Sequence, residues 1–362
     1  MPSDMSFPLE YSIIIVWILI GLFTPNNKGK AKYLVLLPLL IYMIFIAFFR
    51  APTVGTDYLT YIDLFKHVNT NNIKSIHDVY RTEMGFLREM IIFKWFSDSY
   101  VVFYGIQFLI FALGFWHYCK FKKADDIWSV LVFFFVGFYF RSFNAIRQFM
   151  VMGLAFFCLP WLEKGKYIKF AIPIVLFSLL FHSSELLFLL LIPIHLFKDK
   201  RLFTWKIVPF VALVLSFSLF FLDHTFINEL QLLGMMGERF NLYFDSGATR
   251  EEIGYATAGV YTLYAIIVLL CANLKKYGFE VWTVVLSVIV FNVGSIIHIT
   301  VARLALDFML MMCPLGSLMI RDKSTKMRLL FAIATLTVSV ALFIVQFVIN
   351  NNSDVKPYLM GF

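Results

Sequence analysis

Two arginines, Arg141 and Arg147, lie close together just before a long apolar stretch, a position that favours anion binding. The segment Arg141–Gln148 ends on Arg147 and Gln148 and leads directly into an apolar stretch that reaches Leu162. A guanidinium can hold a phosphate through two parallel hydrogen bonds, and the unpaired N–H groups of a helix N-terminus attract an anion at the same place. We therefore predict that Arg141, Arg147 and Gln148 bind a diphosphate, with an arginine that snorkels to the membrane surface as the structural alternative.

Two further arginines lie beside acidic or aromatic residues. Arg303 precedes Asp307 by four positions, so the two side chains would share one face of a helix. Ionisable residues in an apolar segment favour a functional role, although a structural ion pair in which Asp307 neutralises Arg303 is the alternative. Arg239 lies close to Tyr243 in a segment that is typical of an amphipathic helix, which suits either a lid or a surface anchor.

His182 could serve as a general base. It opens the turn His182–Glu185 between two short apolar arms, Ile168–Phe181 and Leu186–Phe197. A neutral imidazole there could take a proton from a hydroxyl group, and Glu185 is near enough in sequence to orient it. The alternative is a helical turn stabilised by serine and glutamate, against which the imidazole merely packs.

Carboxylates and aromatic rings gather earlier in the chain. On a helix, Asp57, Tyr58 and Tyr61 would share one face, where the rings could stack on sugars beside a carboxylate. Glu83 follows in Glu83-Met-Gly-Phe86 and is a second candidate carboxylate. An interfacial helix that is capped by Asp57 and carries an aromatic belt explains the first group equally well.

The elements that position these residues are membrane helices. Of the 362 residues, 60% are hydrophobic and 15% are charged, which excludes an ordinary soluble domain. Long continuous apolar runs predict an all-α, polytopic integral membrane protein with about 12 spans. The short stretch Met84–Phe96 contains three charged residues and is predicted to be interfacial or re-entrant. The predicted spans are Tyr11–Phe23, Tyr33–Phe49, Tyr100–Tyr118, Ile127–Phe140, Ala145–Leu162, Ile168–Phe181, Leu186–Phe197, Thr204–Leu222, Thr257–Asn273, Val281–His298, Arg303–Ile320 and Leu329–Ile349.

The distribution of basic residues orients these spans. One side carries 16 lysines and 3 arginines in short loops, and the other carries 4 lysines and 8 arginines. By the positive-inside rule the lysine-rich side is cytoplasmic, so both long loops, residues 50–99 and 223–256, lie outside. Because arginine is favoured where phosphate must be bound, the outer face is the predicted working face of a single membrane domain, 1–362. Met1–Pro8 holds no lysine or arginine, so we expect no cleaved signal peptide.

Several classes of function find no support. The four cysteines are far apart within apolar segments, so we predict buried thiols and neither disulfides nor metal ligands. Walker A, dinucleotide, zinc-protease and serine-hydrolase motifs are missing, and we expect no cofactor and no metal. The net charge of +8 is explained by loop orientation, so we predict no nucleic-acid partner.

The order of these motifs resembles the EpsG family of Wzy-like polysaccharide polymerases over about residues 50–307. The motifs that carry the resemblance are Gly55-Thr-Asp57-Tyr58, Glu83-Met-Gly85-Phe86, Arg147-Gln148, His182-Ser183-Ser184 and Arg303. The resemblance implies a GT-C-related architecture and transfer of a growing chain from polyprenyl diphosphate onto a newly flipped lipid-linked repeat unit. The reaction would occur at the periplasmic face of the bacterial inner membrane, with membrane lipid and a chain-length regulator protein as further partners.

Roles for the candidate residues follow from this resemblance. Arg147 and Arg303, together with Arg239, would hold the diphosphate leaving group. His182, or else Asp57 or Glu83, would deprotonate the acceptor hydroxyl, and His182 is favoured because its ordinary pKa lies near neutrality. A lipid-linked oligosaccharide flippase is one alternative, although charges near the bilayer midplane are missing. A membrane O-acyltransferase is the other, although it needs a cytoplasmic entry route for its acyl donor.

Overall fold

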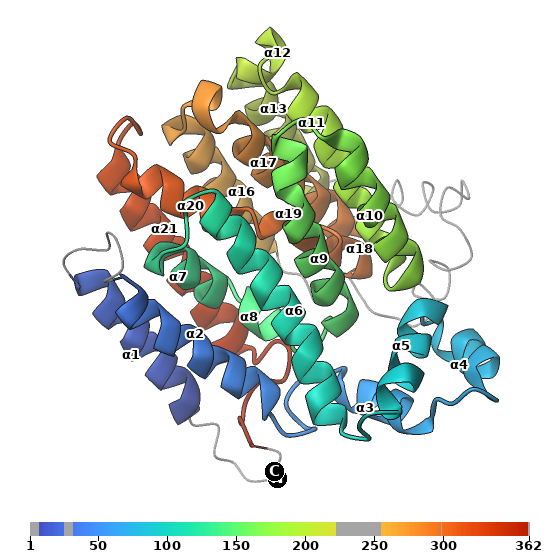
Figure 1. Cartoon of the computed structure of the whole chain (residues 1–362). Coiled ribbons are helices and arrows are strands. Elements are labelled where there is room, and N and C mark those ends of the chain that lie inside the picture. The colour runs from blue at the N-terminus through green and yellow to red at the C-terminus, as the bar shows by residue number, and fades with distance from the viewer. Residues whose placement is uncertain (1–6, 25–31, 222–254, 298, 361–362) are drawn as a thin grey trace. The chain divides into compact units, whose positions relative to one another are not determined.

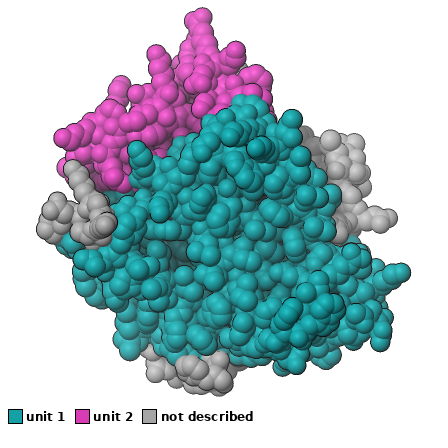
Figure 2. All heavy atoms as spheres, in the orientation of Figure 1, with its two compact units in different colours: residues 1–189, 339–362 teal, residues 190–338 magenta. Residues whose placement is uncertain are grey.

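The computed structural model describes residues 7–24, 32–221, 255–297 and 299–360. Within these ranges the chain is helical without strands, apart from one isolated bridge between Arg50 and Met360 (Figure 1). This confirms the predicted all-α class. The chain divides into two compact units, which Figure 2 shows in teal and magenta. Unit 1 comprises Met1–Leu189 with Ser339–Phe362, and unit 2 comprises Leu190–Val338.

Unit 1 holds the N-terminal half of the chain and its C-terminal end. Its helices are α1 (Leu9–Phe23), α2 (Lys32–Phe48), α3 (Tyr58–His67), α4 (Ile73–Tyr80), α5 (Met84–Lys94), α6 (Tyr100–Phe121), α7 (Ile127–Phe135), α8 (Phe138–Arg141), α9 (Ile146–Glu163), α10 (Tyr167–Leu180), the 3-10 helix η2 (Ser183–Leu190), which runs on into unit 2 by one residue, and the C-terminal η5 (Ile344–Ile349).

Two glycines allow α6 and α9 to pack backbone to backbone in unit 1. A methyl group on Gly114 of α6 would overlap the carbonyl of Gly153 in α9, and one on Gly153 would overlap the backbone of Phe111. Small residues at a helix interface let backbones approach closely, which is a common way to join membrane helices. The N-terminus of α9, where Arg147 lies, is thereby held against α6 (Figure 1).

Unit 2 contains the other helices of the described residues. They are α11 (Leu191–Phe197), α12 (Arg201–Thr204), α13 (Ile207–Ser218), η3 (Leu219–Phe221), α16 (Tyr255–Cys271), α17 (Leu274–Ile297), α18 (Ile299–Arg303), α19 (Leu306–Met309), α20 (Met312–Arg321) and α21 (Arg328–Phe343), whose last turns belong to unit 1. The amide of Asn292 on α17 donates to Ser216 Oγ at 3.0 Å and to Thr262 Oγ1 at 2.9 Å, which joins α17 to α13 and α16. The predicted long loop 223–256 lies almost wholly outside the described residues.

Five helical stretches in the described part are long and apolar enough to cross a membrane. They are Tyr100–Phe121, Ile146–Glu163, Leu274–Ile296, Val301–Arg321 and Arg328–Ile349, and the same part holds six shorter apolar helices of 10–17 residues. The protein is therefore a helical membrane protein, and the full set of twelve spans stays a prediction. The four cysteines are buried, as predicted, and none of them forms a disulfide.

The predicted continuous span Ile127–Phe140 is wrong in detail. The structure breaks it into α7 and α8 at Gly137, whose φ of 89° is readily adopted only by glycine. The ring of Phe347 occupies the place where a side chain on residue 137 would lie. The break therefore serves the packing of the C-terminal segment.

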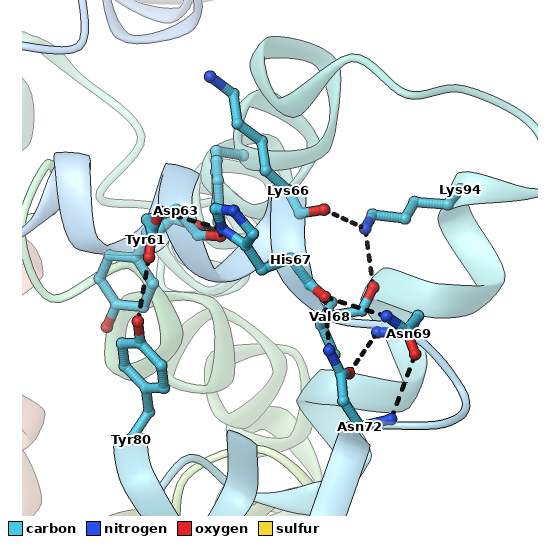
Figure 3. A network of polar contacts seen from close by, with 10 residues as sticks. Tyr61, Asp63, Lys66, His67, Val68, Asn69, Asn72, Tyr80 and Lys94 are labelled. Carbon is cyan, nitrogen blue, oxygen red and sulfur yellow. Dashed lines mark hydrogen bonds and ion pairs between the residues drawn. The ribbon is translucent and has the colours of Figure 1, made fainter. Parts of the chain in front are cut away.

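The first long loop is itself helical and forms α3, α4 and α5. Lys94 at the end of α5 donates through Nζ to the carbonyls of Lys66 and Val68, at 3.1 and 2.8 Å, where α3 ends (Figure 3). The amides of Asn69 and Asn72 both donate to the carbonyl of His67. Helix C-termini leave carbonyls without intrahelical partners, and a lysine ammonium is a favourable cap there. These contacts tie α3 to α5, and the stretch Met84–Phe96 contains an 11-residue helix that is not among the candidate spans.

Candidate functional site

The start of α5 docks on the turn that follows α10. Gly85 lies so close to α10 that a methyl group on it would overlap the carbonyl oxygen of Leu180. Glu83, two residues earlier, accepts from the backbone N–H of Ser183 at 3.2 Å and lies 3.5 Å from its hydroxyl, both at Oε1. The sequence Glu83-Met-Gly85-Phe86 therefore combines a carboxylate with the small residue that lets it reach this turn.

Arg147 reaches the same carboxylate from α9. Its Nη1 forms an ion pair with Glu83 Oε2, and its Nε lies 3.4 Å from the hydroxyl of Tyr61. The guanidinium carbon also lies 5.8 Å from the ring centre of Phe86 and 6.0 Å from that of Tyr61. Aromatic faces attract a cation, so the arginine is held between two rings and a carboxylate.

His182 completes the cluster on the other side of Glu83. Its Nδ1 lies 3.8 Å from Glu83 Oε1, an ion-pair distance once the imidazole is protonated. The side chains of Glu83, Arg147 and His182 are 11, 16 and 25% exposed, so the cluster is screened from bulk water yet open to a ligand. We call these three residues together with Ser183 and Tyr61 the Glu83 cluster.

The cluster brings together four of the predicted site residues in a pairing that the sequence did not indicate. Glu185 was the expected orienting carboxylate, and it is buried on η2, where its N–H bonds back to the carbonyl of His182. The carboxylate within ion-pair distance of the imidazole is Glu83. Nothing in the spacing of these residues indicates that contact, because it depends on how α5 packs on α10.

Tyr61 and Tyr58 have different surroundings on α3. Tyr61 is half-buried, and its carbonyl accepts from the hydroxyl of Tyr104 on α6. Tyr58 is fully buried, and its ring lies 4.0 Å beneath the guanidinium of Arg50. The Tyr58 ring, which was predicted to stack on a sugar, therefore packs inward at the N-terminus of α3.

Arg50 is buried just after the end of α2, and its side chain donates hydrogen bonds to backbone carbonyls. It donates through Nη1 to the carbonyl of Ala47 at 2.5 Å and through Nη2 to that of Phe143 at 3.3 Å. Burial lowers the pKa of this guanidinium, while nearby tyrosines act in the opposite direction. A cation is favourable at a helix C-terminus, so Arg50 links α2 to the turn before α9.

Asp57 precedes α3 at a turn that Asn144 supports. Gly55 has a φ of 111°, and a methyl group on it would lie 2.7 Å from Asn144 Oδ1. The N–H of Asp57 donates to the same oxygen at 3.5 Å, and Asn144 Nδ2 donates to the carbonyl of Ser353 at 3.2 Å. Sequence reasoning missed Asn144 and the C-terminal segment, and only the position of Asn144 between Arg141 and Arg147 could have drawn attention to it.

Arg141 and Gln148, two further predicted residues, have other surroundings in unit 1. Arg141 donates through Nη2 to Gln346 Oε1 at 2.7 Å, and Gln148 is buried within α9. In unit 2, Arg303 ends α18 and is exposed, whereas Asp307 lies on the next helix, α19, and is 1% exposed. Arg239 lies outside the described residues.

A second carboxyl group, Glu89, lies one helical turn after Gly85 on α5. Gln107 Nε2 on α6 donates to its Oε1 at 2.9 Å, whereas its Oε2 is buried without a hydrogen-bond partner. Burial raises the pKa of Glu89, and the bond from Gln107 partly offsets this effect. Over the described ranges, no three His, Cys, Asp or Glu side chains gather as a metal site would require.

Comparison with known proteins assigns a family to the chain. The family model described as the EpsG family matches residues 11–360, nearly the whole chain. No curated protein and no solved structure matches it.

Proposed function

The chain belongs to the EpsG family of Wzy-like polysaccharide polymerases, and from this premise we propose that it joins polyprenyl-diphosphate-linked oligosaccharides by glycosyl transfer at the periplasmic face of the inner membrane. The bond between the sugar and the diphosphate would break, and the anomeric carbon would bond to a hydroxyl of the acceptor repeat unit. The diphosphate lipid leaves, and the hydroxyl proton passes to a base.

The observation that carries the proposal is the convergence of a guanidinium, a carboxylate and an imidazole in the Glu83 cluster. Arg147 would bind the diphosphate and neutralise the charge that develops on it as the bond breaks. Its position at the N-terminus of α9 supports this role, because helix N-termini favour anions. The guanidinium supplies the positive charge, so the proposed step uses no metal ion and no nucleotide sugar.

His182 would act as the general base. A carboxylate facing Nδ1 favours the tautomer that carries its hydrogen there, which leaves the Nε2 lone pair to accept a proton from the acceptor hydroxyl. Asp57 is the alternative base at the start of α3, and Tyr61 offers the ring against which a sugar could stack. The diphosphate-binding roles of Arg303 and Arg239 rest on the resemblance alone.

The first experiment deletes the gene in its host and complements the deletion with wild-type or Arg147→Ala protein. We expect the deletion and the variant each to leave a single repeat unit on the surface glycolipid in gel analysis, with normal variant protein in the membrane. A deletion that exports no repeat unit would instead indicate a flippase, and full-length chains with altered modification would indicate an acyltransferase. Wild-type chain lengths with Arg147→Ala would rule out its diphosphate role.

Arg147→Lys is the sharper variant. A lysine ammonium keeps the charge but not the planar fork that holds phosphate through two hydrogen bonds, so we expect shortened chains with a large loss of extension. Arg88→Lys is the matched control, because Arg88 is exposed on α5. It should give wild-type chains, and equal losses in both variants would show that the effect is not specific to the guanidinium of Arg147.

A further inference from the structure

Glu83 shares its two oxygens between two groups that the proposed reaction uses. Oε2 pairs with the Arg147 guanidinium, and Oε1 faces His182 Nδ1 and the N–H of Ser183. Both oxygens therefore accept from neighbouring groups, which makes Glu83 a poor base for a sugar hydroxyl. The arrangement suits a carboxylate that acts through its neighbours.

Charged and titratable groups from several elements surround the turn that carries the imidazole. They include Glu83 from the start of α5, Arg147 from α9, Tyr61 from α3 beyond Arg147, and Glu185 on η2, whose N–H bonds to the His182 carbonyl. While Arg147 pairs with Glu83, the guanidinium offsets much of the negative charge that the imidazole experiences. A diphosphate that binds Arg147 would compete for the same N–H donors.

We propose that Glu83 is a positioning residue that couples donor binding to activation of the base, an inference that rests on the proposed function. When the diphosphate engages Arg147, the Glu83 carboxylate loses its cationic partner and acts fully on His182. The imidazole then becomes a stronger proton acceptor, because a nearby negative charge stabilises its protonated form. His182 takes the acceptor proton at Nε2 as the new glycosidic bond forms and releases it to water after the diphosphate lipid leaves. The base is thus strongest when a donor is in place.

The test follows the protonation of His182 without relying on polymer synthesis. Purified full-length protein in nanodiscs is treated with diethyl pyrocarbonate, which modifies a histidine only when its imidazole is neutral. The modified His182 peptide is then measured by mass spectrometry across pH. Geranylgeranyl diphosphate serves as the probe that occupies Arg147. The midpoint of the pH profile is compared rather than the rate, because a bound probe also shields the ring.

We expect Glu83→Gln to lower the midpoint by about one pH unit, the effect of an opposite charge at this range. The probe should raise the midpoint in the wild type, and this rise should shrink to less than half in Glu83→Gln. Glu83→Asp keeps the charge and should restore most of both effects. Glu83→Ala, which also removes the charge and should give the same losses, replaces Glu83→Gln if the amide variant fails to fold.

Two controls separate this role from a structural one. Glu89→Gln removes another partly buried carboxyl group from the same helix and should leave the midpoint unchanged. Glu185→Gln asks whether the carboxylate next in sequence is the effective one, and a lowered midpoint there with none in Glu83→Gln would overturn the proposal. An unchanged midpoint and an undiminished probe effect in Glu83→Gln would also overturn it.

Failure of this inference is distinguishable from failure of the proposed function. If Arg147→Ala abolishes chain extension while Glu83→Gln titrates as the wild type, only the coupling role is lost. If Arg147→Ala leaves full-length chains, the proposed polymerase mechanism through Arg147 is ruled out, whatever the midpoint of the His182 pH profile.

Discussion

At the level of single residues, the Glu89 carboxyl group makes stability depend on pH. Burial raises its pKa in the folded protein, so the folded state holds the proton more tightly than the unfolded chain does. Its contribution is therefore complete below the unfolded pKa of about 4.3 and is lost as pH rises through the higher folded value.

Replacing Glu89 with glutamine should remove this pH dependence. We expect the melting temperature of Glu89→Gln in detergent to match the wild type near pH 4 and to exceed it at pH 7, because the neutral amide carries no burial cost. Thermal unfolding followed by intrinsic fluorescence at both pH values measures the difference. A variant that is less stable at pH 7 would mean that the carboxylate gains more from Gln107 than it loses by burial.

The sequence indicated the members of the Glu83 cluster but not their pairing. Arg147 and His182 carry types and positions that predict anion binding and base chemistry, because both properties belong to the residue and its local turn. The ion pair of Glu83 with Arg147 depends on contacts between α5, α9 and the turn after α10, which no local spacing records. The burial of Tyr58 was hidden for the same reason, since its ring packs against the guanidinium of Arg50, which lies elsewhere in the sequence.

At the level of elements, the close approach of α5 to α10 makes Gly85 a sensitive position. Gly85→Ala would place a methyl group on the Leu180 carbonyl, and relief of that overlap must separate the two helices. Overpacking of this kind typically costs about 1–3 kcal/mol, and here it also pulls Glu83 from Ser183. We expect a lower melting temperature together with loss of chain extension in the complementation assay.

Gly259→Ala on α16 is the matched control for that substitution. A methyl group there meets Phe217 at 3.5 Å, an ordinary contact, and alanine is favoured over glycine within a helix by about 0.5–1 kcal/mol. Its melting temperature should be unchanged or higher. Equal losses in both variants would show that the α5–α10 contact has no special importance.

Helix positions were easier to predict than helix continuity. Twelve apolar segments could be located because membrane burial demands long apolar runs, and the described part of the structure has helices at these positions. Gly137 is compatible with a break between α7 and α8. A glycine alone does not show, however, that the ring of Phe347 occupies the place where a side chain on residue 137 would lie. Within residues 50–99 the sequence indicated a helix after Asp57 and an interfacial stretch over Met84–Phe96, whereas α4, which is only eight residues long, was not predicted.

At the level of the whole molecule, the unequal distribution of lysine and arginine between the two sides predicts which side of the membrane each loop faces. The proposed function requires this orientation. A donor carried on the outer leaflet can reach Arg147 only if the Glu83 cluster faces outward. The same orientation requires that α5 does not cross the membrane, since a crossing would move Lys123 and its neighbours to the outer side. Orientation and the path of α5 are therefore tested together.

Three single cysteines can decide this orientation. The native cysteines are buried, whereas Lys74 on α4, Lys123 after α6 and Lys275 on α17 are exposed, so cysteines placed there should dominate labelling. We expect a membrane-impermeant maleimide to label Lys74→Cys in intact spheroplasts, and Lys123→Cys and Lys275→Cys only after the membrane is disrupted. Labelling of Lys123→Cys together with Lys74→Cys would show that α5 crosses the membrane. The reverse pattern, with Lys275→Cys labelled first, would place the Glu83 cluster on the cytoplasmic side, where a diphosphate donor on the outer leaflet could not reach Arg147.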